Sequence, residues 1–347
     1  MVHVQPSPIA TLFPGYFALV MATGIVAIAA QQQSLELLAE ALYVITVVAY
    51  VVLAGLLSTR IIWFWSDFTA DVTNHARGFA FLTTVAASNV LAAASIVIHG
   101  WWDLAWALWW FSLVLWAVFT YTTLIAVVIH SDKPGLQGGI NGSWFLLTVS
   151  TQSIAVVAGL FLTRTDSDAL TFTAIATFTL GIVLYLIVMT MVFLRWTFQP
   201  LDPTEADPPA WIAAGAVAIT VLAGSNILLA GDQAPERVGR LAPFLEGLVV
   251  MSWATATFWF PLMIAIGIWR HLVRRVPLRY HPSYWGMVFP LGMYGAATYR
   301  MRAAIDLDAL AWLPKLELAV SLAALTITFV GLAWHAIHHT GRSRGPR

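Results

Sequence analysis

Long stretches without a charged residue most constrain what this chain can fold into. Ten stretches of 19 or more residues contain no Asp, Glu, Lys or Arg, and together they cover 254 of the 347 residues. A helix needs about 20 apolar residues to cross the hydrocarbon core of a membrane. A β-barrel would instead show short segments of alternating hydrophobicity. The sequence therefore predicts an all-α membrane protein, and it excludes a soluble enzyme and a nucleic-acid-binding protein.

Ten transmembrane helices are expected, and they use nearly the whole chain. We assign residues 1–347 to a single transmembrane domain with spans at about 12–31, 38–58, 78–98, 104–129, 143–163, 169–194, 210–231, 245–269, 282–301 and 314–338. Ten spans place both termini on one side. That side holds eleven Lys and Arg residues against six on the other. Because Lys and Arg are enriched on the cytoplasmic side, we expect a multi-pass protein of the inner (cytoplasmic) membrane with both termini cytoplasmic.

Composition limits the chemistry further. The 17 Lys and Arg residues balance the 17 Asp and Glu residues, so net charge indicates no polyanionic partner such as nucleic acid. The chain has no cysteine, which excludes thiolate metal sites and iron–sulfur clusters. No two predicted spans offer facing mid-membrane histidines, as a membrane haem would require. The sequence thus predicts no cofactor, no metal site and no catalytic residue.

Neutral polar residues enter the predicted spans unevenly, because the side-chain amides at depth all fall in odd-numbered spans. Small and polar residues in spans commonly serve to pack helices and to hydrogen-bond between them. The restriction to odd spans favours, for the group, a shared wet interior. The candidate pore-lining residues are Thr23, Gly24, Thr84, Asn89, Thr151, Gln152, Ser225, Asn226 and Gly292.

The ninth predicted span carries Phe289 directly before a mid-span proline, Pro290. A proline there removes one backbone donor and bends the helix, and it frees a carbonyl that needs a partner or water. Phe289 either packs against lipid or a neighbouring helix, or closes a narrow conduit by steric blockage and dewetting. The residues alone leave both possibilities open.

Five segments, in order along the chain, resemble the tellurite-resistance/dicarboxylate transporter family. That family includes tellurite-resistance channel homologues, slow anion channels, malate permeases and sulfite exporters. The resemblance covers essentially the whole chain, and the ninth span looks closest to the bacterial C4-dicarboxylate/malate branch. The segments are 13–27 (FPGYFALVMATGIVA), 74–81 (NHARGFAF), 141–159 (NGSWFLLTVSTQSIAVVAG), 211–224 (WIAAGAVAITVLAG) and 284–298 (YWGMVFPLGMYGAAT).

The resemblance implies a fold of five helical hairpins around a pseudo-fivefold central pore, lined by the odd-numbered spans, in a homotrimer. It also implies that Phe289, with Pro290, is the pore gate. We therefore expect an anion channel or permease, not an enzyme, whose partners are small inorganic anions or C4-dicarboxylates and the lipid bilayer. A proton-coupled dicarboxylate (malate) or sulfite carrier is the alternative. A membrane redox enzyme is less favoured, because ionisable residues do not converge at one membrane depth.

Overall fold

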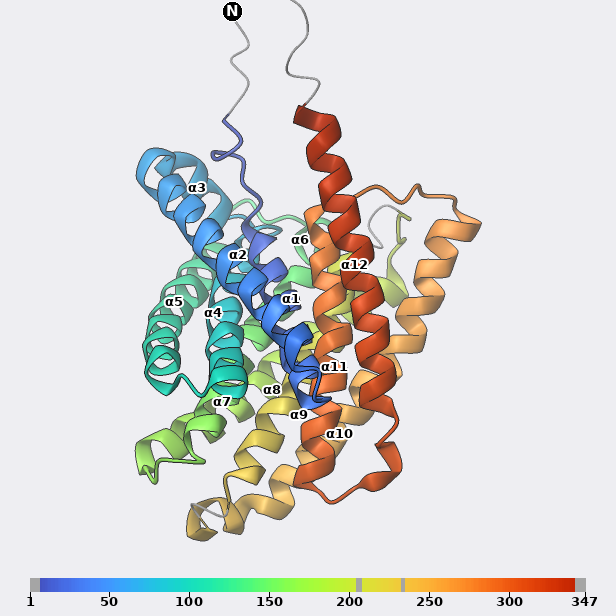
Figure 1. Cartoon of the computed structure of the whole chain (residues 1–347). Helices are drawn as coiled ribbons and strands as arrows, with labels where there is room; N and C mark the ends of the chain where they lie inside the picture. The colour runs from blue at the N-terminus through green and yellow to red at the C-terminus, as the bar shows by residue number, and fades with distance from the viewer. Residues whose placement is uncertain (1–6, 204–207, 232–234, 341–347) are drawn as a thin grey trace, which may run out of the picture.

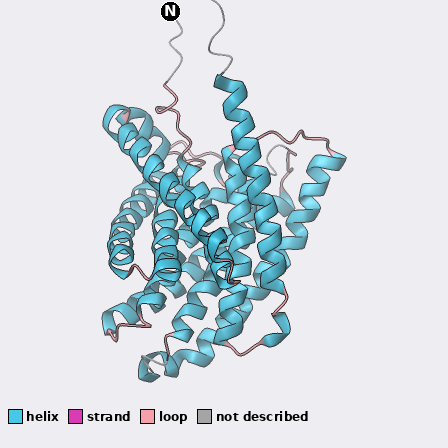
Figure 2. Ribbon diagram, viewed as in Figure 1, coloured by secondary structure: helices cyan, strands magenta, loops and turns pink. Residues whose placement is uncertain are grey.

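The computed structural model describes residues 7–203, 208–231 and 235–340, which form helices without any strand in these ranges (Figure 2). Nine helices of this described part are long and apolar enough to cross a membrane. The predicted all-α membrane fold is confirmed. The assignment of residues 1–347 to a single domain stays a prediction, and its two ends lie outside the described residues.

Long helices of two kinds alternate along the chain (Figure 1). The inner helices lie almost wholly within the protein, and the outer helices expose most of their apolar surface: the buried share is 83–94% for four inner spans and 22–33% for the outer ones. The inner helices are α1 (Ala18–Gln32), α4 (Thr83–Ala94), α7 (Leu146–Phe161), α9 (Ile212–Leu229) and α11 (Trp285–Ala304). The outer helices are α2 (Glu36–Trp63), α5 (Trp102–Ile129), α8 (Asp168–Phe198), α10 (Pro235–Ile268) and α12 (Leu313–Thr340).

The inner helices close a ring. Each packs against the next in the order α1, α4, α7, α9, α11 and back to α1. Each outer helix packs on the inner helix that precedes it in the chain, so α2 covers α1, α5 covers α4, α8 covers α7, α10 covers α9 and α12 covers α11. These contacts agree with the expected five hairpins, while the pseudo-fivefold symmetry of the ring stays a prediction.

The helix α11 occupies the place of the ninth predicted span, but it is not among the nine helices that are apolar enough to span a membrane. Its 20 residues include Pro290, two arginines and three glycines, which lower its hydropathy. It packs against α1, α9 and α12. A helix enclosed by protein in this way needs no apolar surface for lipid, so low hydropathy is compatible with its central position. Ten membrane crossings remain a prediction.

Predicted and observed boundaries differ by only a few residues for most spans. The span predicted at 104–129 is α5, Trp102–Ile129. The largest difference is at α10, which begins at Pro235 instead of 245. Residues 235–244 carry Glu236, Arg237 and Arg240, so they extend the helix beyond its charge-free stretch. Two short helices, α3 (Trp65–Val72) and α6 (Leu136–Gly139), lie in loops.

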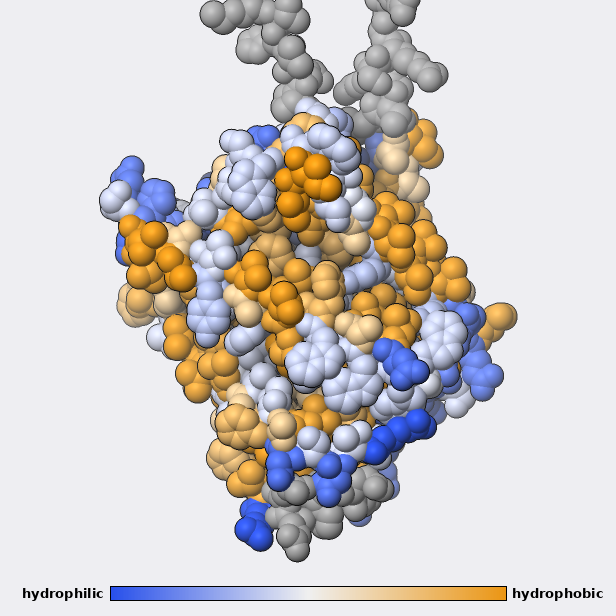
Figure 3. Space-filling view, turned by 90° about the vertical axis from the view of Figure 1, so that its left-hand side faces the viewer, coloured by the Kyte–Doolittle hydropathy of each residue, from blue (hydrophilic) through white to orange (hydrophobic). Residues whose placement is uncertain are grey.

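The outer surface has the character of a membrane protein. In the face shown in Figure 3, hydrophobic residues spread over the middle, and the most hydrophilic residues gather toward the edges of the view. The described residues nearest the two termini lie at the same end of the bundle (Figure 1). The position of these two ends fits a chain that crosses a membrane an even number of times.

Candidate functional site

The inner helices begin in a shared structure at one end of the ring. Each is preceded by a 3₁₀ turn: η1 (Pro14–Phe17), η2 (Gly78–Leu82), η4 (Gly142–Phe145), η5 (Pro208–Trp211) and η7 (Pro282–Tyr284). These turns contact one another in the same cyclic order as the helices. The amino-terminal ends of all five inner helices, which carry partial positive charge, therefore meet at one place.

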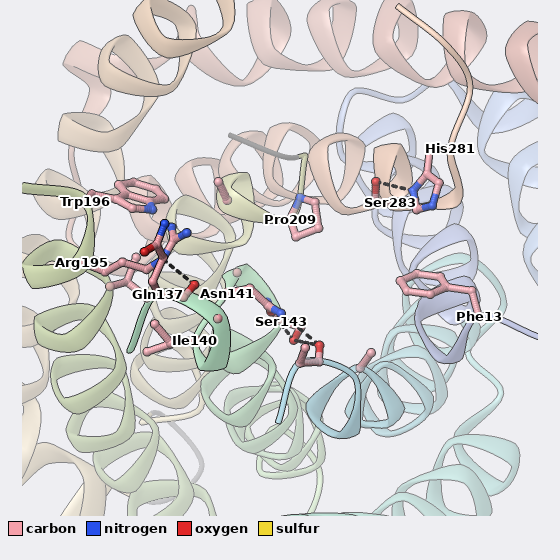
Figure 4. A pocket seen from close by; sticks show the side chains of 16 residues that line it. Phe13, Gln137, Ile140, Asn141, Ser143, Arg195, Trp196, Pro209, His281 and Ser283 are labelled. Carbon is pink, nitrogen blue, oxygen red and sulfur yellow. Dashed lines mark hydrogen bonds between the residues drawn. The ribbon is translucent and has the colours of Figure 1, made fainter. Parts of the chain in front are cut away.

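A cavity of about 370 Å³ opens among these turns, and we call it the vestibule (Figure 4). Residues from the start of every inner helix line it. At its wall the Asn141 side-chain oxygen accepts a hydrogen bond from the backbone N–H of Ser143 at 2.8 Å, and the Asn141 amide donates to the carbonyl of Ala76 at 3.0 Å. Across the vestibule, His281 Nδ1 accepts from the N–H of Ser283 at 3.2 Å. Two of the five helix starts are thus fixed by side-chain caps.

One buried cation reaches the vestibule from an outer helix. Arg195, in the last turn of α8, is only 6% exposed, and its Nε donates to the carbonyl of Gln137 at 3.2 Å (Figure 4). A buried guanidinium is costly unless it is hydrogen-bonded, so its position here is a feature that the fold maintains. The sequence marks Arg195 as one more charge at the end of a span. No signal in the sequence distinguishes it from the charges that face water.

Phe289 lies deeper along the axis of the ring than the vestibule, where α11 packs against α9. Its side chain is 1% exposed. A Cβ placed on Gly215 of α9 would lie 2.8 Å from Cγ of Pro290 and 3.3 Å from two carbons of the Phe289 ring. Glycine at 215 therefore provides the space that the Phe289-Pro290 pair fills. The structure brings these two predicted residues together with an α9 residue that the sequence analysis did not single out.

A second, much smaller cavity lies at the centre of the ring, and all five inner helices line it. Its volume, counted as space open to the centre of a water molecule, is about 10 Å³, roughly what one water needs. Of the nine predicted pore-lining residues, Asn89 alone belongs to its lining. The lining residues are Ile25, Ile28, Asn89, Val90, Ala93, Ser153, Val156, Ile219, Leu222 and Met293.

Three other predicted residues make hydrogen bonds outward, to the outer helices. Thr23 accepts from the Thr46 hydroxyl of α2 at 2.9 Å. Thr151 accepts from the Trp116 indole of α5 at 2.9 Å, and Gln152 donates its amide N–H to the Phe178 carbonyl of α8 at 2.8 Å. These contacts join the two layers, as polar side chains in membrane bundles commonly do. We therefore leave the three residues out of the pathway proposed below.

The two predicted glycines and Thr84 lie in packed positions. A Cβ on Gly24 would come within 2.6 Å of the Val90 side chain, and a Cβ on Gly292 within 2.9 Å of Val26. Both glycines therefore allow inner helices to approach closely. Thr84 donates to the carbonyl of Phe81, one turn earlier in its own segment.

At the other end of the ring, the predicted pair Ser225 and Asn226 meets an arginine. Arg300 Nε, on α11, donates to Asn226 Oδ1 on α9 at 2.9 Å, and the Asn226 amide donates to the Val156 carbonyl on α7 at 3.2 Å. Ser225 is fully buried. The sequence places Arg300 at the edge of the ninth predicted span, where it is one more charge near a membrane surface. Its position three turns after Phe289 on the same helix is the signal that could have placed it in the ring.

Within the described residues, no group of three or more His, Asp or Glu side chains is placed to hold a metal ion. The arrangement that remains is a closed ring of helices with an arginine near each of its ends. Such an arrangement is one that a protein moving charged solutes across the bilayer would use. The profile of the SLAC1 family, described as voltage-dependent anion channel, matches residues 11–333, so the chain belongs to this family of anion channels and transporters.

Three proteins similar in sequence to this chain are described as transporters or membrane proteins. An "uncharacterized transporter" of Methanocaldococcus jannaschii is 23% identical over 299 residues, which are 82% of this chain and 82% of the relative. A second "uncharacterized transporter" of that organism is 22% identical over 297 residues, which are 82% of this chain and 83% of the relative. An "uncharacterized membrane protein" of Mycobacterium tuberculosis H37Rv is 42% identical over 160 residues, 46% of this chain and 80% of the relative. The family membership inferred from the five segments is confirmed, as is a multi-pass membrane protein.

Proposed function

We propose that this protein is a channel or permease that moves small anions along the axis of the inner ring. The observation that carries the proposal is one arginine at each end of an otherwise uncharged path. Arg195 lies beside the vestibule, and Arg300 is bonded to Asn226 at the opposite end. Between these levels the inner helices carry no charged residue. Cations at the two mouths attract anions and repel cations, and the neutral interior holds neither tightly.

The vestibule also favours anions over cations. Five helix amino termini surround it, and each contributes partial positive charge toward its centre. Together with Arg195 they raise the local concentration of anions before any enters the ring. In the vestibule an anion can replace part of its hydration water by hydrogen bonds from N–H groups. It would then enter the narrow part of the path.

Phe289 and Pro290 form the gate in this proposal. The buried Phe289 ring fits against Gly215, where α9 and α11 meet beyond the vestibule. A bend at Pro290 leaves the helix able to shift the ring without breaking a complete hydrogen-bond ladder. Asn89 and Asn226 are the amides closest to the path, one in the central cavity and one at the far mouth.

The proposed substrates are small inorganic anions or C4-dicarboxylates. We further propose a homotrimer in the cytoplasmic membrane, with both termini and the vestibule on the cytoplasmic side, as the distribution of Lys and Arg supports. The terminal residues themselves lie outside the described part of the chain.

Planar-bilayer recording tests the proposal. Purified protein is reconstituted, and currents are measured under gradients of chloride, nitrate, sulfite and malate in turn. We expect currents that reverse near the equilibrium potential of the anion and not of the cation. Cation-selective current, or none with any of the four anions under conditions that keep the protein folded, contradicts the proposal.

A second candidate, the proton-coupled carrier, rests on Glu317 of α12. Glu317 is half-buried with its Cβ against Gly295 of α11, and its Oε2 is buried without a hydrogen-bond partner in the described structure. A titratable group in such a position is the element that a proton-coupled carrier needs. Saturable malate uptake driven by a pH gradient, and lost in Glu317→Gln, would favour the carrier. A rate of malate uptake that does not change with the pH gradient would favour the channel.

A further inference from the structure

An open groove runs between the last turns of α8 and the second half of α10, two of the outer helices. Its volume is about 630 Å³, larger than that of the vestibule. Phe193, Trp196 and Thr197 of α8 form one wall, and residues of α10 from Phe258 to Ile266 form the other. Phe193 and Phe258 are exposed. The groove therefore lies on the apolar surface that a membrane would cover.

Large aromatic side chains keep the two helices apart and so create the groove. The Trp259 indole of α10 donates to the Tyr185 hydroxyl of α8 at 2.9 Å. The Trp259 ring also lies edge-on to the Trp196 ring, with 6.1 Å between their centres. Trp259 and Tyr185 are both buried. Because buried rings are closely packed, the gap beside them is a fixed feature of the fold.

The lining of the groove is almost entirely apolar. Its one hydroxyl, on Thr197, already donates to the Phe193 carbonyl of the same helix at 2.7 Å. The indoles of Trp196 and Trp269 lie toward one end, where α8 and α10 both finish. Indole rings prefer the level of the lipid headgroups. The groove thus offers contact area for a hydrocarbon chain below that level.

The length of the groove matches one leaflet of a bilayer. Trp269 and Phe258, at its two ends, are eleven residues apart along the same helical segment, a rise of about 16 Å. The hydrocarbon core is about 30 Å thick, so one leaflet contributes about 15 Å. An acyl chain that enters beside Trp269 therefore ends near Phe258, close to the centre of the bilayer.

Arginines lie at the end of the groove that carries the indoles. There α10 continues into the turn η6 (Trp269–Val273), and Arg274 and Arg275 follow it. The guanidinium carbon of Arg274 lies 5.4 Å from the centre of the Trp269 ring. Both arginines are exposed, and within the described part of the chain neither pairs with a carboxylate. Their charge is available to an anionic group at the membrane surface.

Backbone hydrogen bonds hold the segment of these arginines against the end of α10. The N–H of Arg274 donates to the Trp269 carbonyl at 2.9 Å, and the N–H of Val276 donates to the Arg270 carbonyl at 3.1 Å. No Asp or Glu occurs between residues 247 and 305. Asp202, which follows the last lining residue after α8, lowers the positive charge here without cancelling it.

We propose that this groove binds one anionic phospholipid of the leaflet on the vestibule side. An acyl chain fills the groove, and the phosphate lies at Arg274 and Arg275. The distribution of Lys and Arg places this end at the cytoplasmic face, whose leaflet carries anionic lipids. Trp196 lines both the groove and the vestibule, so the bound lipid touches a side chain of the vestibule wall. The site does not depend on which solute the protein moves.

Native mass spectrometry tests the charge requirement. Delipidated protein in detergent is titrated with phosphatidylglycerol or with phosphatidylcholine that has the same oleoyl chains. We expect the first phosphatidylglycerol to bind at least about fivefold more tightly, because each arginine at a membrane surface contributes about that factor. Arg274→Gln combined with Arg275→Gln removes the preference. Equal affinity of the two lipids for the unsubstituted protein, or a preference that survives in the double variant, overturns the proposal.

Arg164→Gln is the matched control for charge. The Arg164 guanidinium lies 4.2 Å from the centre of the Trp102 ring, the same pairing of arginine with tryptophan. It follows the end of α7 that is opposite the vestibule. The preference for phosphatidylglycerol should therefore remain in this variant. A loss equal to that of the double variant would show that any arginine supplies the effect, and it would overturn the assigned position.

Filling the groove tests the requirement for the acyl chain. Ala265→Trp places a large ring in the lining at an exposed position, and it should weaken binding of both lipids by about fivefold or more, because the chain loses its apolar contact area. Ala254→Trp is the control, exposed on the same helix but outside the lining. Lipid binding that Ala265→Trp leaves unchanged overturns the proposal. If that variant instead separates the oligomer in gel filtration, the groove is a contact between copies of this chain.

Cross-linking tests where the lipid lies. One equivalent of phosphatidylglycerol with a diazirine at the end of an acyl chain is added and irradiated, and the labelled peptides are identified. We expect the label near Phe258 and Leu262, at the inner end of the groove. Glycerol 3-phosphate at the same concentration should not displace the lipid, because it lacks the chain. Label confined to other helices, or displacement by glycerol 3-phosphate, contradicts a phospholipid in the groove.

Discussion

Arg300 of α11 donates a hydrogen bond from Nε to the Asn226 side-chain oxygen of α9 at 2.9 Å. The Asn226 amide in turn donates a hydrogen bond to the Val156 carbonyl of α7. The cation is therefore held near the ends of three inner helices. Val156 also lines the central cavity. The arginine is thereby fixed at this end of the ring.

Arg300→Gln is expected to lower anion flux by about threefold or more, because a fixed cation at a mouth raises the local concentration of anions. The glutamine keeps a donor for Asn226, so folding is little affected. Arg302→Gln is the matched control: Arg302 lies two residues away and pairs with the exposed Asp308 at 2.8 Å. Flux measured in proteoliposomes at low and high salt checks the prediction. An equal loss in both variants, or none at position 300, contradicts it.

Gly215→Ala is expected to destabilise the protein by about 1–3 kcal/mol, because overpacking forces neighbours out of their positions. The added methyl would meet the Pro290 ring at 2.8 Å, and a proline ring has little freedom to move. Gly247→Ala on α10 is the control, since nothing lies within 4 Å of a Cβ there. Thermal unfolding in detergent compares the two. A Gly215→Ala protein as stable as Gly247→Ala would mean that Phe289 and Pro290 do not lie against residue 215.

Gln152→Met is expected to reduce stability by about 0.5–1.5 kcal/mol and to leave anion selectivity unchanged. The substitution removes the 2.8 Å bond to the Phe178 carbonyl of α8, and such bonds are worth about that much in membrane proteins. Asn89→Leu provides the contrast, because Asn89 lines the central cavity. Reversal potentials in mixed chloride and malate test both. A selectivity change from Gln152→Met would return this residue to the pathway.

The sequence predicts most of the long helices well, because a membrane requires long apolar stretches that hydropathy can detect. The spans of α5 and α8 are found within four residues of their predicted ends. Hydropathy says less about the inner helices. α11, enclosed by protein, does not reach the hydropathy of a membrane span, and the absence of charge over 280–299 is what locates it. On α7, Thr151, Gln152 and Ser153 are consecutive and all buried, so no periodicity tells which of them faces the axis.

Contacts between helices supply what the sequence lacks. Ser153 reaches the central cavity, whereas its neighbours Thr151 and Gln152 reach α5 and α8. In the sequence Arg195 is a cation at the end of a helix. In the structure its side chain lines the vestibule. Both outcomes depend on how helices rotate about their own axes. The rotation of each helix is set by its packing against several neighbouring helices at once. The residues of that helix alone therefore do not predict it.

His75 is expected to titrate at lower pH than an ordinary histidine. Partial burial lowers its pKa first, and the nearby His130 and Lys133 lower it further; the His75 and His130 rings lie 5.9 Å apart. The unfolded chain therefore binds a proton at a pH where the folded protein still does not. Stability is then full above the ordinary histidine pKa of about 6.5 and falls as pH drops through it. Histidine-selective NMR titration measures this pKa directly. Lys133→Gln should raise it. A His75 pKa at or above the ordinary histidine value of about 6.5, or one that falls in Lys133→Gln, contradicts the prediction.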